Sequence, residues 1–230
     1  MIRSIGVIVP AHNEQDLLPS CLASLRRAAR AARCAPVHLV VVADACRDQT
    51  AQVARRAGAS VVRINARSAG RARAAGARAI LRRTRYPDPA DLWLATTDAD
   101  TLVPGCWLRQ QAGYASQGWD AIVGTIQVDD WSGRPAETGS VFREGYEAGT
   151  GPHAHVHGAN LGCRGSAYLA AGGFPGLATG EDHAFVTALA ATGSRVLRTR
   201  ALPVTTSARR ESRAPGGFGD YLARLESASA

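Results

Sequence analysis

The sequence predicts a doubly wound α/β fold, in which a mostly parallel sheet of the Rossmann-like type carries helices on both faces. Short continuous apolar runs, such as VHLVVV and LWLAT, alternate along the chain with segments that have apolar residues at helical spacing. Acid-containing loops follow three of these runs. Because the carboxyl ends of parallel strands meet at one edge of a sheet, a ligand is expected at that edge.

The first half of the chain repeats this strand-and-helix unit. Strands with the loops that follow them are expected within 4–13, 37–50, 60–66 and 92–100, and helices within 14–33, 51–59 and 68–85. The loops that would share one edge contain the segments 10–14, 44–48 and 98–100. Carboxylates from separate strands are therefore expected to lie close together.

The second half has a different pattern after Gly118. We expect a strand within 119–131, a strand, loop and short helix within 152–174, and a helix with an acidic start within 180–193. Strands, an arginine- and glycine-rich loop and a terminal helix are expected within 195–225. With no internal repeat and no linker, residues 1–230 are expected to form a single domain.

Composition limits the classes of partner. The net charge is +8, and arginine supplies all of the positive charge because the chain contains no lysine. Guanidinium groups match phosphate oxygens, so phosphate-bearing small molecules are expected partners. Nucleic acid is not expected, because aromatic residues make up 6% of the chain and do not interleave with the arginines.

Cysteine usage and hydropathy indicate a cytoplasmic location. Five cysteines occur at scattered spacings without a C-x-x-C pair, which argues against a disulfide framework and a zinc knuckle. The N-terminal segment meets a proline and charged residues too early for a signal peptide. No apolar run approaches the roughly 20 residues of a transmembrane helix, so none is expected.

Asp98 and Asp100 follow the fourth apolar run. In an extended loop, residues two apart point the same way, so both carboxylates can face one hard divalent cation. The alternative interpretation is that Asp100 caps a helix beginning near Thr101 while Asp98 is solvated. The pair alone does not decide between these interpretations.

Several motifs together resemble one family. IGVIVPAHNEQDLLPSCLASL, an aspartate after the second strand, Asp-x-Asp after the fourth, and GGF followed by GEDHAF occur in this order between Ile5 and Gly193. This arrangement is similar to the family-two glycosyltransferases of the GT-A fold. The resemblance implies transfer of a sugar from a nucleoside diphosphate sugar with a divalent metal, Mn²⁺ or Mg²⁺. It also implies a nucleotide-sugar-binding half at 1–117 and an acceptor-binding half at 118–230.

The resemblance assigns five residues of the first half to the donor. Pro10, Ala11 and Glu14 match the loop that borders the nucleoside, and Asp44 matches the carboxylate that accepts a hydrogen bond from the base. The family's usual double aspartate is reduced here to Ala43-Asp44, which leaves the identity of the base open. Arg71 matches a basic position that faces the diphosphate, with a solvated arginine as the alternative.

The same resemblance assigns the chemistry. Asp98 and Asp100 match the metal motif, with Asp98 also beside the donor, and Asp182 matches the general base of inverting members. Glu181 belongs to the same acidic pair, on the acceptor side, although a helix N-terminus would also favour an acidic residue there. Asp48 is instead expected to cap the helix that follows it.

Residues of the segment HAHVHGAN are expected near the acceptor. His153, His155 and His157 share one face if this segment is a strand. They would then either bind a transition metal or line an acceptor pocket, in which His157 or Asn160 bonds a hydroxyl. Close to the C-terminus, Arg209, Arg210 and Arg213 form either a loop that closes over the diphosphate or a basic tail.

We therefore expect a metal-dependent, inverting glycosyltransferase. One alternative is a non-catalytic protein that binds nucleotide sugars or acts as a scaffold, since the Ala43–Cys46 loop departs from the family pattern. Another is a nucleotidyltransferase, but its usual glycine-rich phosphate loop is missing after the first strand. A dinucleotide-binding oxidoreductase is disfavoured because no G-x-G-x-x-G follows an early strand.

Overall fold

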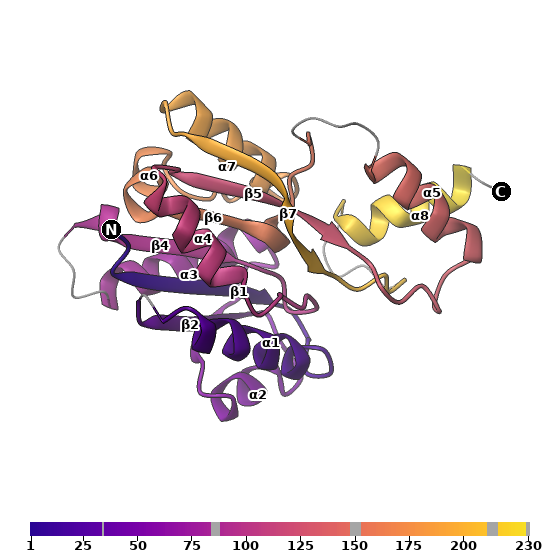
Figure 1. Ribbon diagram of the computed structural model, residues 1–230. Coiled ribbons are helices and arrows are strands. Elements are labelled where there is room, and N and C mark those ends of the chain that lie inside the picture. Colours follow the sequence, from indigo (N-terminus) through magenta and orange to yellow (C-terminus); the bar gives the residue numbers. More distant parts are fainter. Residues whose placement is uncertain (34, 84–87, 148–152, 211–215, 229–230) are drawn as a thin grey trace.

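The computed structural model describes residues 1–33, 35–83, 88–147, 153–210 and 216–228 (Figure 1). Its core is a seven-stranded sheet with the order β3-β2-β1-β4-β6-β5-β7. Strands β1 to β4 run parallel, as do β5 and β7, whereas β6 is antiparallel to both of its neighbours. The predicted doubly wound α/β fold is confirmed.

The strands are β1 (Ser4–Ala11), β2 (Val37–Asp44), β3 (Ser60–Ile64), β4 (Leu92–Thr96), β5 (Ala121–Gln127), β6 (Leu161–Arg164) and β7 (Val196–Thr205). The helices are α1 (Leu18–Ala31), α2 (Thr50–Arg56), α3 (Ala69–Arg83), α4 (Trp107–Ser116), α5 (Ala136–Glu147), α6 (Gly165–Ala170), α7 (Glu181–Ala191) and α8 (Phe218–Ala228). Two short 3₁₀ turns, η1 (Pro89–Asp91) and η2 (Gly158–Asn160), precede β4 and β6.

The sheet separates two hydrophobic cores. On one side, alternate residues of β1 pack with α1, α2 and α4, and on the other side Ile8 of β1 packs with α3, α6 and α7. Helix α3 approaches β1 so closely that a Cβ at Gly6 would lie 2.5 Å from the Cγ2 of Ile80. A Cβ at Gly76 would lie equally close to the Cγ2 of Ile8. Glycine at both positions lets α3 lie directly on the sheet, which sets where its N-terminus meets the site.

The structure differs from the expected pattern in three places. Helices α4 and α5 were not predicted, and the histidines between 153 and 157 follow an irregular path although a strand was expected. Helix α5 packs against α8 at one end of the molecule, where Phe142 meets Phe218 edge to face with ring centroids 5.6 Å apart (Figure 1). Among the described helices, none combines the length and apolar character needed to span a bilayer.

Candidate functional site

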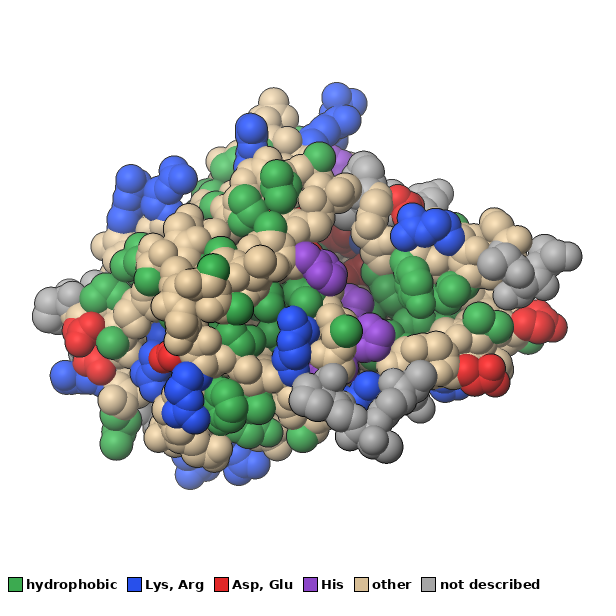
Figure 2. Space-filling model, turned by 90° about the horizontal axis from the view of Figure 1, so that it is seen from above, with side chains coloured by type: hydrophobic (Ala, Val, Ile, Leu, Met, Phe, Trp, Pro, Cys, Tyr) green, Lys and Arg blue, Asp and Glu red, His purple; other side chains and the backbone are tan. Residues whose placement is uncertain are grey.

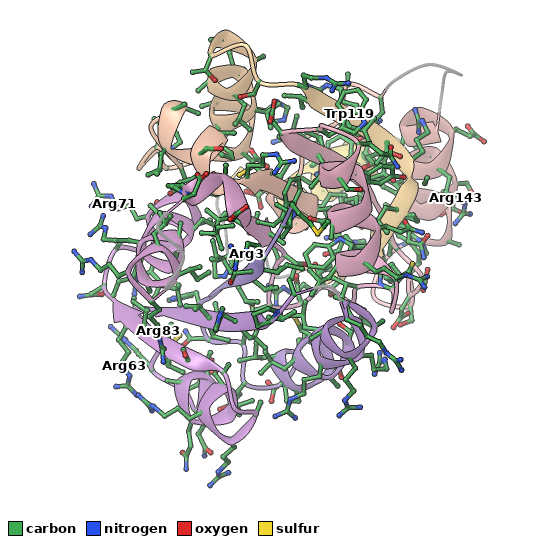
Figure 3. All side chains as sticks on the ribbon, turned by 60° about the vertical axis from the view of Figure 1, so that its left-hand side comes forward. Arg3, Arg63, Arg71, Arg83, Trp119 and Arg143 are labelled. Carbon is green, nitrogen blue, oxygen red and sulfur yellow. The ribbon has the colours of Figure 1, made fainter. Side chains whose placement is uncertain are left out.

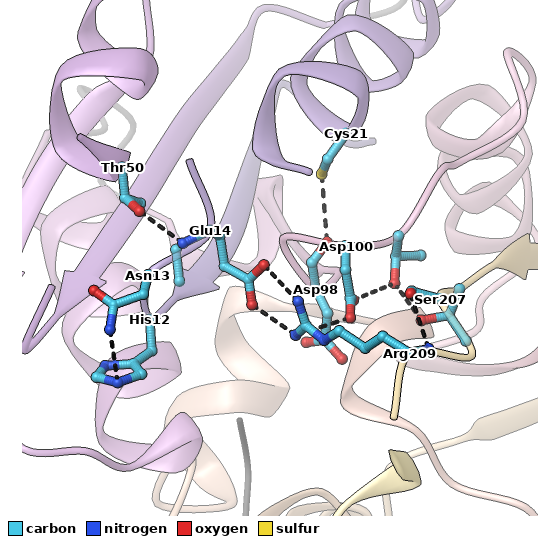
Figure 4. Close-up of polar contacts among 12 residues, drawn as sticks. His12, Asn13, Glu14, Cys21, Thr50, Asp98, Asp100, Ser207 and Arg209 are labelled. Atoms are coloured by element: carbon cyan, nitrogen blue, oxygen red, sulfur yellow. Dashed lines mark hydrogen bonds and ion pairs between the residues drawn. The ribbon is translucent and has the colours of Figure 1, made fainter. Parts of the chain in front are cut away.

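Acidic side chains from two of the three predicted loops gather at the carboxyl edge of the sheet. Glu14 follows β1, while Asp98 and Asp100 follow β4 (Figure 4). Glu14 is buried, with 6% of its side chain exposed, and Asp100 is nearly so at 15%. Asp98 is more open, at 36%. The edge therefore holds a partly buried cluster of negative charge.

Arg209 neutralises two of these carboxylates. Its guanidinium donates to both carboxylate oxygens of Glu14, at 2.7 and 2.8 Å, and one of its nitrogens lies 3.1 Å from Oδ2 of Asp100 (Figure 4). Burial raises the pKa of Asp100 to about 6, opposed by Arg209 and reinforced by the charges of Asp98 and Glu14. The segment after β7 therefore contributes a cation to the acidic edge.

Arg134, just before α5, holds the backbone of that segment. Its buried guanidinium donates to the carbonyl oxygens of Ala208 at 2.5 Å and of Arg209 at 2.8 Å. It also pairs with Glu226 of α8 at 2.9 Å. No local sequence pattern indicated this residue's role, because its partners lie more than seventy residues away in the chain. The predicted loop continues through Arg213, which lies outside the described residues.

A second ion-pair network lies beneath Asp98. The guanidinium of Arg73, on α3, is 2.6 Å from Oδ1 of Asp98, pairs with Glu181 at the start of α7, and donates to the hydroxyl of Thr96 at 3.2 Å. Burial raises the pKa of Glu181, and the charge of Arg73 opposes that shift. Glu181 thus orients Arg73 and is 7% exposed, so contact with an acceptor is not supported.

Arg71 lies on the outer face of α3. Its side chain is exposed and projects from the edge of the molecule (Figure 3). Arg73, two residues later, is the arginine that enters the site. Helical spacing could have found it, because Arg73 falls on the same stripe as the buried Ala77 and Ile80. A diphosphate contact from Arg71 stays a prediction.

Asp44 organises the loop that precedes α3. Its carboxylate accepts hydrogen bonds from the backbone N–H groups of Ala66, Arg67 and Ser68, at 2.6, 2.9 and 2.8 Å. These bonds close the connection between β3 and α3. Asp44 is 4% exposed, which leaves little of its surface for a base. Its predicted contact with the base stays a prediction.

Other residues after β1 and β2 surround this loop. Asp48 lies two residues before Thr50, the first residue of α2, and its Oδ1 accepts from the N–H of Thr50 at 2.9 Å, whereas the cap position itself is Gln49. Pro10 and Ala11 end β1, beside Val42 and Ala43 of β2. Both residues lie at the carboxyl edge of the sheet. Their contact with a nucleoside stays a prediction.

Asp182 occupies the first turn of α7, which begins after Gly180 in a left-handed conformation with φ of 72°. Its Oδ2 accepts the backbone N–H of Gly158 at 2.9 Å, and its Oδ1 accepts the N–H of His183 at 2.8 Å. These bonds hold the half-buried carboxylate beside His157. Burial lowers the pKa of His157 to about 4, although the charge of Asp182 acts in the opposite direction.

The rings of His153, His155 and His157 follow one another in a row that reaches the α5–α8 pair. Figure 2 shows histidine side chains at a hollow in the molecular surface. The ring of His155 stacks on Tyr146 with centroids 3.9 Å apart, and His157 meets Phe218 edge to face at 6.2 Å. Both ring nitrogens of His153 already face backbone carbonyl oxygens. Within the described residues, no group of three or more His, Cys, Asp or Glu is arranged to hold a metal ion, so a histidine metal site is not supported.

Asn160 is a structural residue. Its side-chain oxygen accepts from the indole N–H of Trp107 at 2.9 Å, and its amide donates to the carbonyl oxygens of Thr125 and Leu202 at 2.8 and 2.7 Å. It is 1% exposed, so the predicted acceptor contact is not supported. His157 remains a candidate, because its half-buried ring lies beside Asp182 and its Nε2 atom has no hydrogen-bond partner among the described residues.

The sequence from residue 6 to residue 166 matches the model of the family described as glycosyl transferase family 2. The chain belongs to this family. The matched region contains the acidic loops after β1, β2 and β4, together with the histidine segment. No protein with a curated function matches the chain.

Solved structures share the fold of this glycosyl transferase family 2 chain. Staphylococcus aureus TarS 1-349 in complex with UDP-GlcNAc superposes with a TM-score of 0.65 at 18% identity, over 98% of this chain and 66% of that chain. The mannosyltransferase PcManGT from Pyrobaculum calidifontis, in complex with GDP-Man and Mn²⁺, gives 0.64 at 20% identity over 97% and 69%. Glucosyl-3-phosphoglycerate synthase from Mycobacterium tuberculosis gives 0.58 at 16% identity over 98% and 77%.

These similarities establish the fold. The family 2 chain spans 60% of another TarS 1-349 structure and 37% of a further TarS chain, so the TarS proteins contain segments with no counterpart here. The predicted GT-A architecture is confirmed by the family match and by these superpositions.

The carboxylate oxygens at the carboxyl edge are suitable ligands for a hard divalent cation. Asp98 and Asp100 supply carboxylate oxygens two residues apart, the ligand type that Mg²⁺ and Mn²⁺ prefer. Such ions commonly use one or two carboxylates and complete their coordination with phosphate oxygens and water. Both carboxylates have arginine partners, so an entering cation would compete with the pairings to Arg73 and Arg209.

Proposed function

We propose that this chain transfers a sugar from a nucleoside diphosphate sugar to an acceptor hydroxyl, with inversion at the anomeric carbon. The observation that carries the proposal is that carboxylates from the edge of the sheet and from the head of α7 lie around one buried arginine, Arg73. Asp98 and Asp100 stand at the carboxyl edge of the sheet, and Asp182 stands at the head of α7. The Arg73 network ties the two places together through Asp98 and Glu181. A donor and an acceptor between them would each meet a carboxylate.

Asp182 is the proposed general base. Its carboxylate would remove the proton of the acceptor hydroxyl as the oxygen attacks the anomeric carbon and the bond to the diphosphate breaks. The N–H of Gly158 orients the carboxylate. The unpartnered Nε2 of His157 is the group proposed to bind an acceptor hydroxyl. Neither role requires Asn160, which is occupied within the fold.

The donor side is proposed to use Pro10, Ala11, Glu14 and Asp44 around the nucleoside, with Asp98 and Asp100 holding Mn²⁺ or Mg²⁺. When bound, the cation would offset the negative charge that develops on the departing nucleoside diphosphate. The compounds bound in two similar structures, UDP-GlcNAc in one and GDP-Man with Mn²⁺ in the other, support this choice of substrate class. A cytoplasmic location is inferred from the cysteine pattern of the sequence.

The direct test is calorimetric titration of the protein with UDP, GDP and ADP, each with and without Mn²⁺. We expect one nucleotide to bind in a Mn²⁺-dependent manner and the binding to weaken at least about tenfold in Asp98→Asn. Asp130→Asn is the matched control, because it removes the same charge at an exposed position after β5. If none of the three nucleotides binds to the folded protein, the donor site is wrong.

Turnover separates the proposed transferase from its rivals. A transferase that lacks its acceptor should slowly hydrolyse the donor whose nucleotide it binds. A scaffold protein would bind the donor without any turnover. A nucleotidyltransferase would instead consume a nucleoside triphosphate and release pyrophosphate.

A further inference from the structure

The charge of the molecule is concentrated in one part of the chain. Residues 17–87 hold 15 of the 27 arginines but only two of the 19 acidic residues. Their net charge is +13, whereas the remainder of the chain carries −5. Between residues 49 and 87 there is no acidic residue at all. A codon-driven preference for arginine would not by itself remove the acidic residues from this segment.

The fold turns part of this segment into a continuous edge of the molecule. Strand β3 is one of the two edge strands of the sheet, and α3 follows it in the chain. Figure 3 shows Arg63, Arg71 and Arg83 projecting from this side. The exposed arginines of β3, α3 and the loop between them are called the basic edge: Arg63, Arg67, Arg71, Arg78, Arg82 and Arg83.

The helical part of the basic edge is an ordered row. Arg71, Arg78 and Arg82 recur at spacings of seven and four, which places them on one stripe of α3. The opposite stripe, with Ala77 and Ile80, is buried against the sheet. In the part of the chain that the structure describes, none of the six arginines of the basic edge pairs with a carboxylate. Their charge is therefore available to a partner.

The shape of the basic edge indicates an extended partner. Eleven residues separate Arg71 from Arg82, which corresponds to about 17 Å along a helix axis. Side chains spread over that length cannot converge on one small anion. A charged side chain on an edge strand also discourages sheet-to-sheet association, which explains Arg63 but not the row on α3.

We propose that the basic edge docks the protein on a membrane surface rich in anionic phospholipid. Arginine matches phosphate headgroups, and several basic residues near such a surface add their attraction. Residues 1–85 contain no Phe, Tyr or Trp, so the edge lacks the rings on which proteins stack the bases of single-stranded nucleic acid.

A hollow of about 140 Å³ lies next to the first residues of β2 and β3 and the last turn of α3. It is lined by His38, Ser60 and Arg83 together with apolar residues of β2 and α3. The guanidinium of Arg83 donates to the hydroxyl of Ser60 at 2.6 Å, which fixes its position beside the hollow. A single phosphate headgroup can be held there while the row on α3 contacts its neighbours.

The test is co-sedimentation of the protein with lipid vesicles. Vesicles of phosphatidylcholine alone are compared with vesicles that contain about 30% phosphatidylglycerol, at about 50 mM and about 500 mM NaCl. We expect binding to the anionic vesicles at low salt, little binding to the neutral ones, and release at high salt. Binding without preference for anionic lipid, or no binding at low salt, overturns the proposal.

Two matched variants locate the surface. The triple variant Arg63→Gln, Arg78→Gln, Arg82→Gln removes three charges from the basic edge and lowers vesicle affinity roughly a hundredfold. The control triple variant replaces the exposed Arg109, Arg143 and Arg224 by Gln on α4, α5 and α8. Both variants have a net charge of +5, and the control should lose less than about threefold.

Equal losses in the two triple variants would mean that vesicles sense total charge alone, which overturns the docking surface. Binding of a short RNA or DNA duplex more tightly than of anionic vesicles, at the same salt concentration, would assign the basic edge to nucleic acid instead. All six substituted arginines are exposed, and thermal unfolding confirms that both variants are folded. None of these measurements depends on the proposed sugar transfer.

Discussion

Arg209 and Glu14 form a two-point contact, in which both carboxylate oxygens accept from the same guanidinium, at 2.7 and 2.8 Å, across 195 positions of the chain. Asp100 lies 3.1 Å from one of those guanidinium nitrogens. The proposed cation ligand is thus partly neutralised by a side chain from the segment after β7. This pairing makes the acidic edge stable without a bound ion, and it sets up a competition with any cation that enters.

Replacing Arg209 with Gln should strengthen binding of Mn²⁺ in the absence of nucleotide. Removal of a positive charge beside Asp100 increases the attraction for a divalent ion, by roughly tenfold in affinity. Electron paramagnetic resonance of free Mn²⁺ measures that affinity directly. The neighbouring Arg210→Gln removes the same charge from an exposed residue that bonds the carbonyl of Gly133, and it should change the affinity little. Unchanged Mn²⁺ binding in Arg209→Gln would show that the two cations do not compete.

Arg73 should matter far more for stability than Arg71 on the same helix. Arg73→Gln leaves Asp98 and Glu181 without their buried partner, so we expect a loss of about 3–5 kcal/mol in the free energy of unfolding. Arg71→Gln alters an exposed side chain and should stay within about 0.5 kcal/mol of the parent. Urea denaturation of the two variants makes the comparison. Similar losses in both would contradict the buried network.

The position of the candidate site at the carboxyl edge of the sheet was predictable, because parallel strands all end at that edge. Loops after β1 and β4 had to meet once alternating strands and helices were recognised, and Glu14, Asp98 and Asp100 do meet there. The partner of Glu14 was not predictable, since no local pattern links residue 14 to Arg209. The internal partners of Asn160 were not predictable either, because a polar residue in a loop-like segment gives no sign that Trp107 and two carbonyl groups will surround it.

The histidine segment shows the same limit of local reasoning. Alternation of His153, His155 and His157 suggested a strand, but the rings are placed by partners on other elements, among them Tyr146 of α5 and Phe218 of α8. Helix α5 itself was missed in the sequence. Its apolar positions are completed by α8, so the reason for its amphipathic pattern lies about eighty residues away.

His157 should lower the stability of the folded protein in mild acid. Burial holds the pKa of His157 at about 4 in the folded protein, against 6.5 in its ordinary state, although Asp182 attracts the proton and His153, His155 and His183 repel it. Between these two pKa values His157 is therefore protonated in the unfolded chain and neutral in the folded protein. The contribution of His157 to stability is constant above about pH 6.5, falls by about 3 kcal/mol between about 6.5 and 4, and levels off below. Asp100 contributes in the opposite direction between about pH 6 and 4, because its pKa is raised to about 6 in the folded protein.

Denaturant unfolding at a series of pH values tests the contribution of His157. His157→Gln should become more stable relative to the parent as the pH falls from about 6.5 to 4, because glutamine does not titrate in this range. His38→Gln, at an exposed position on β2, should keep the pH profile of the parent. An unchanged pH profile in His157→Gln would show that His157 does not contribute to acid sensitivity.

Asp182→Asn should separate binding from chemistry. The amide keeps an oxygen that can accept the N–H of Gly158, so the fold and the affinity for nucleotide should remain within about threefold of the parent. Asparagine cannot take up the proton of the attacking hydroxyl, so hydrolysis of the donor, with water as the acceptor, should fall by a factor of about 10² to 10⁴. Nuclear magnetic resonance of the first sugar released by the parent protein reports its anomeric configuration, which should be opposite to that of the donor. Parental hydrolysis in Asp182→Asn would remove this residue from the role of base, and retention of configuration would exclude the single inverting displacement.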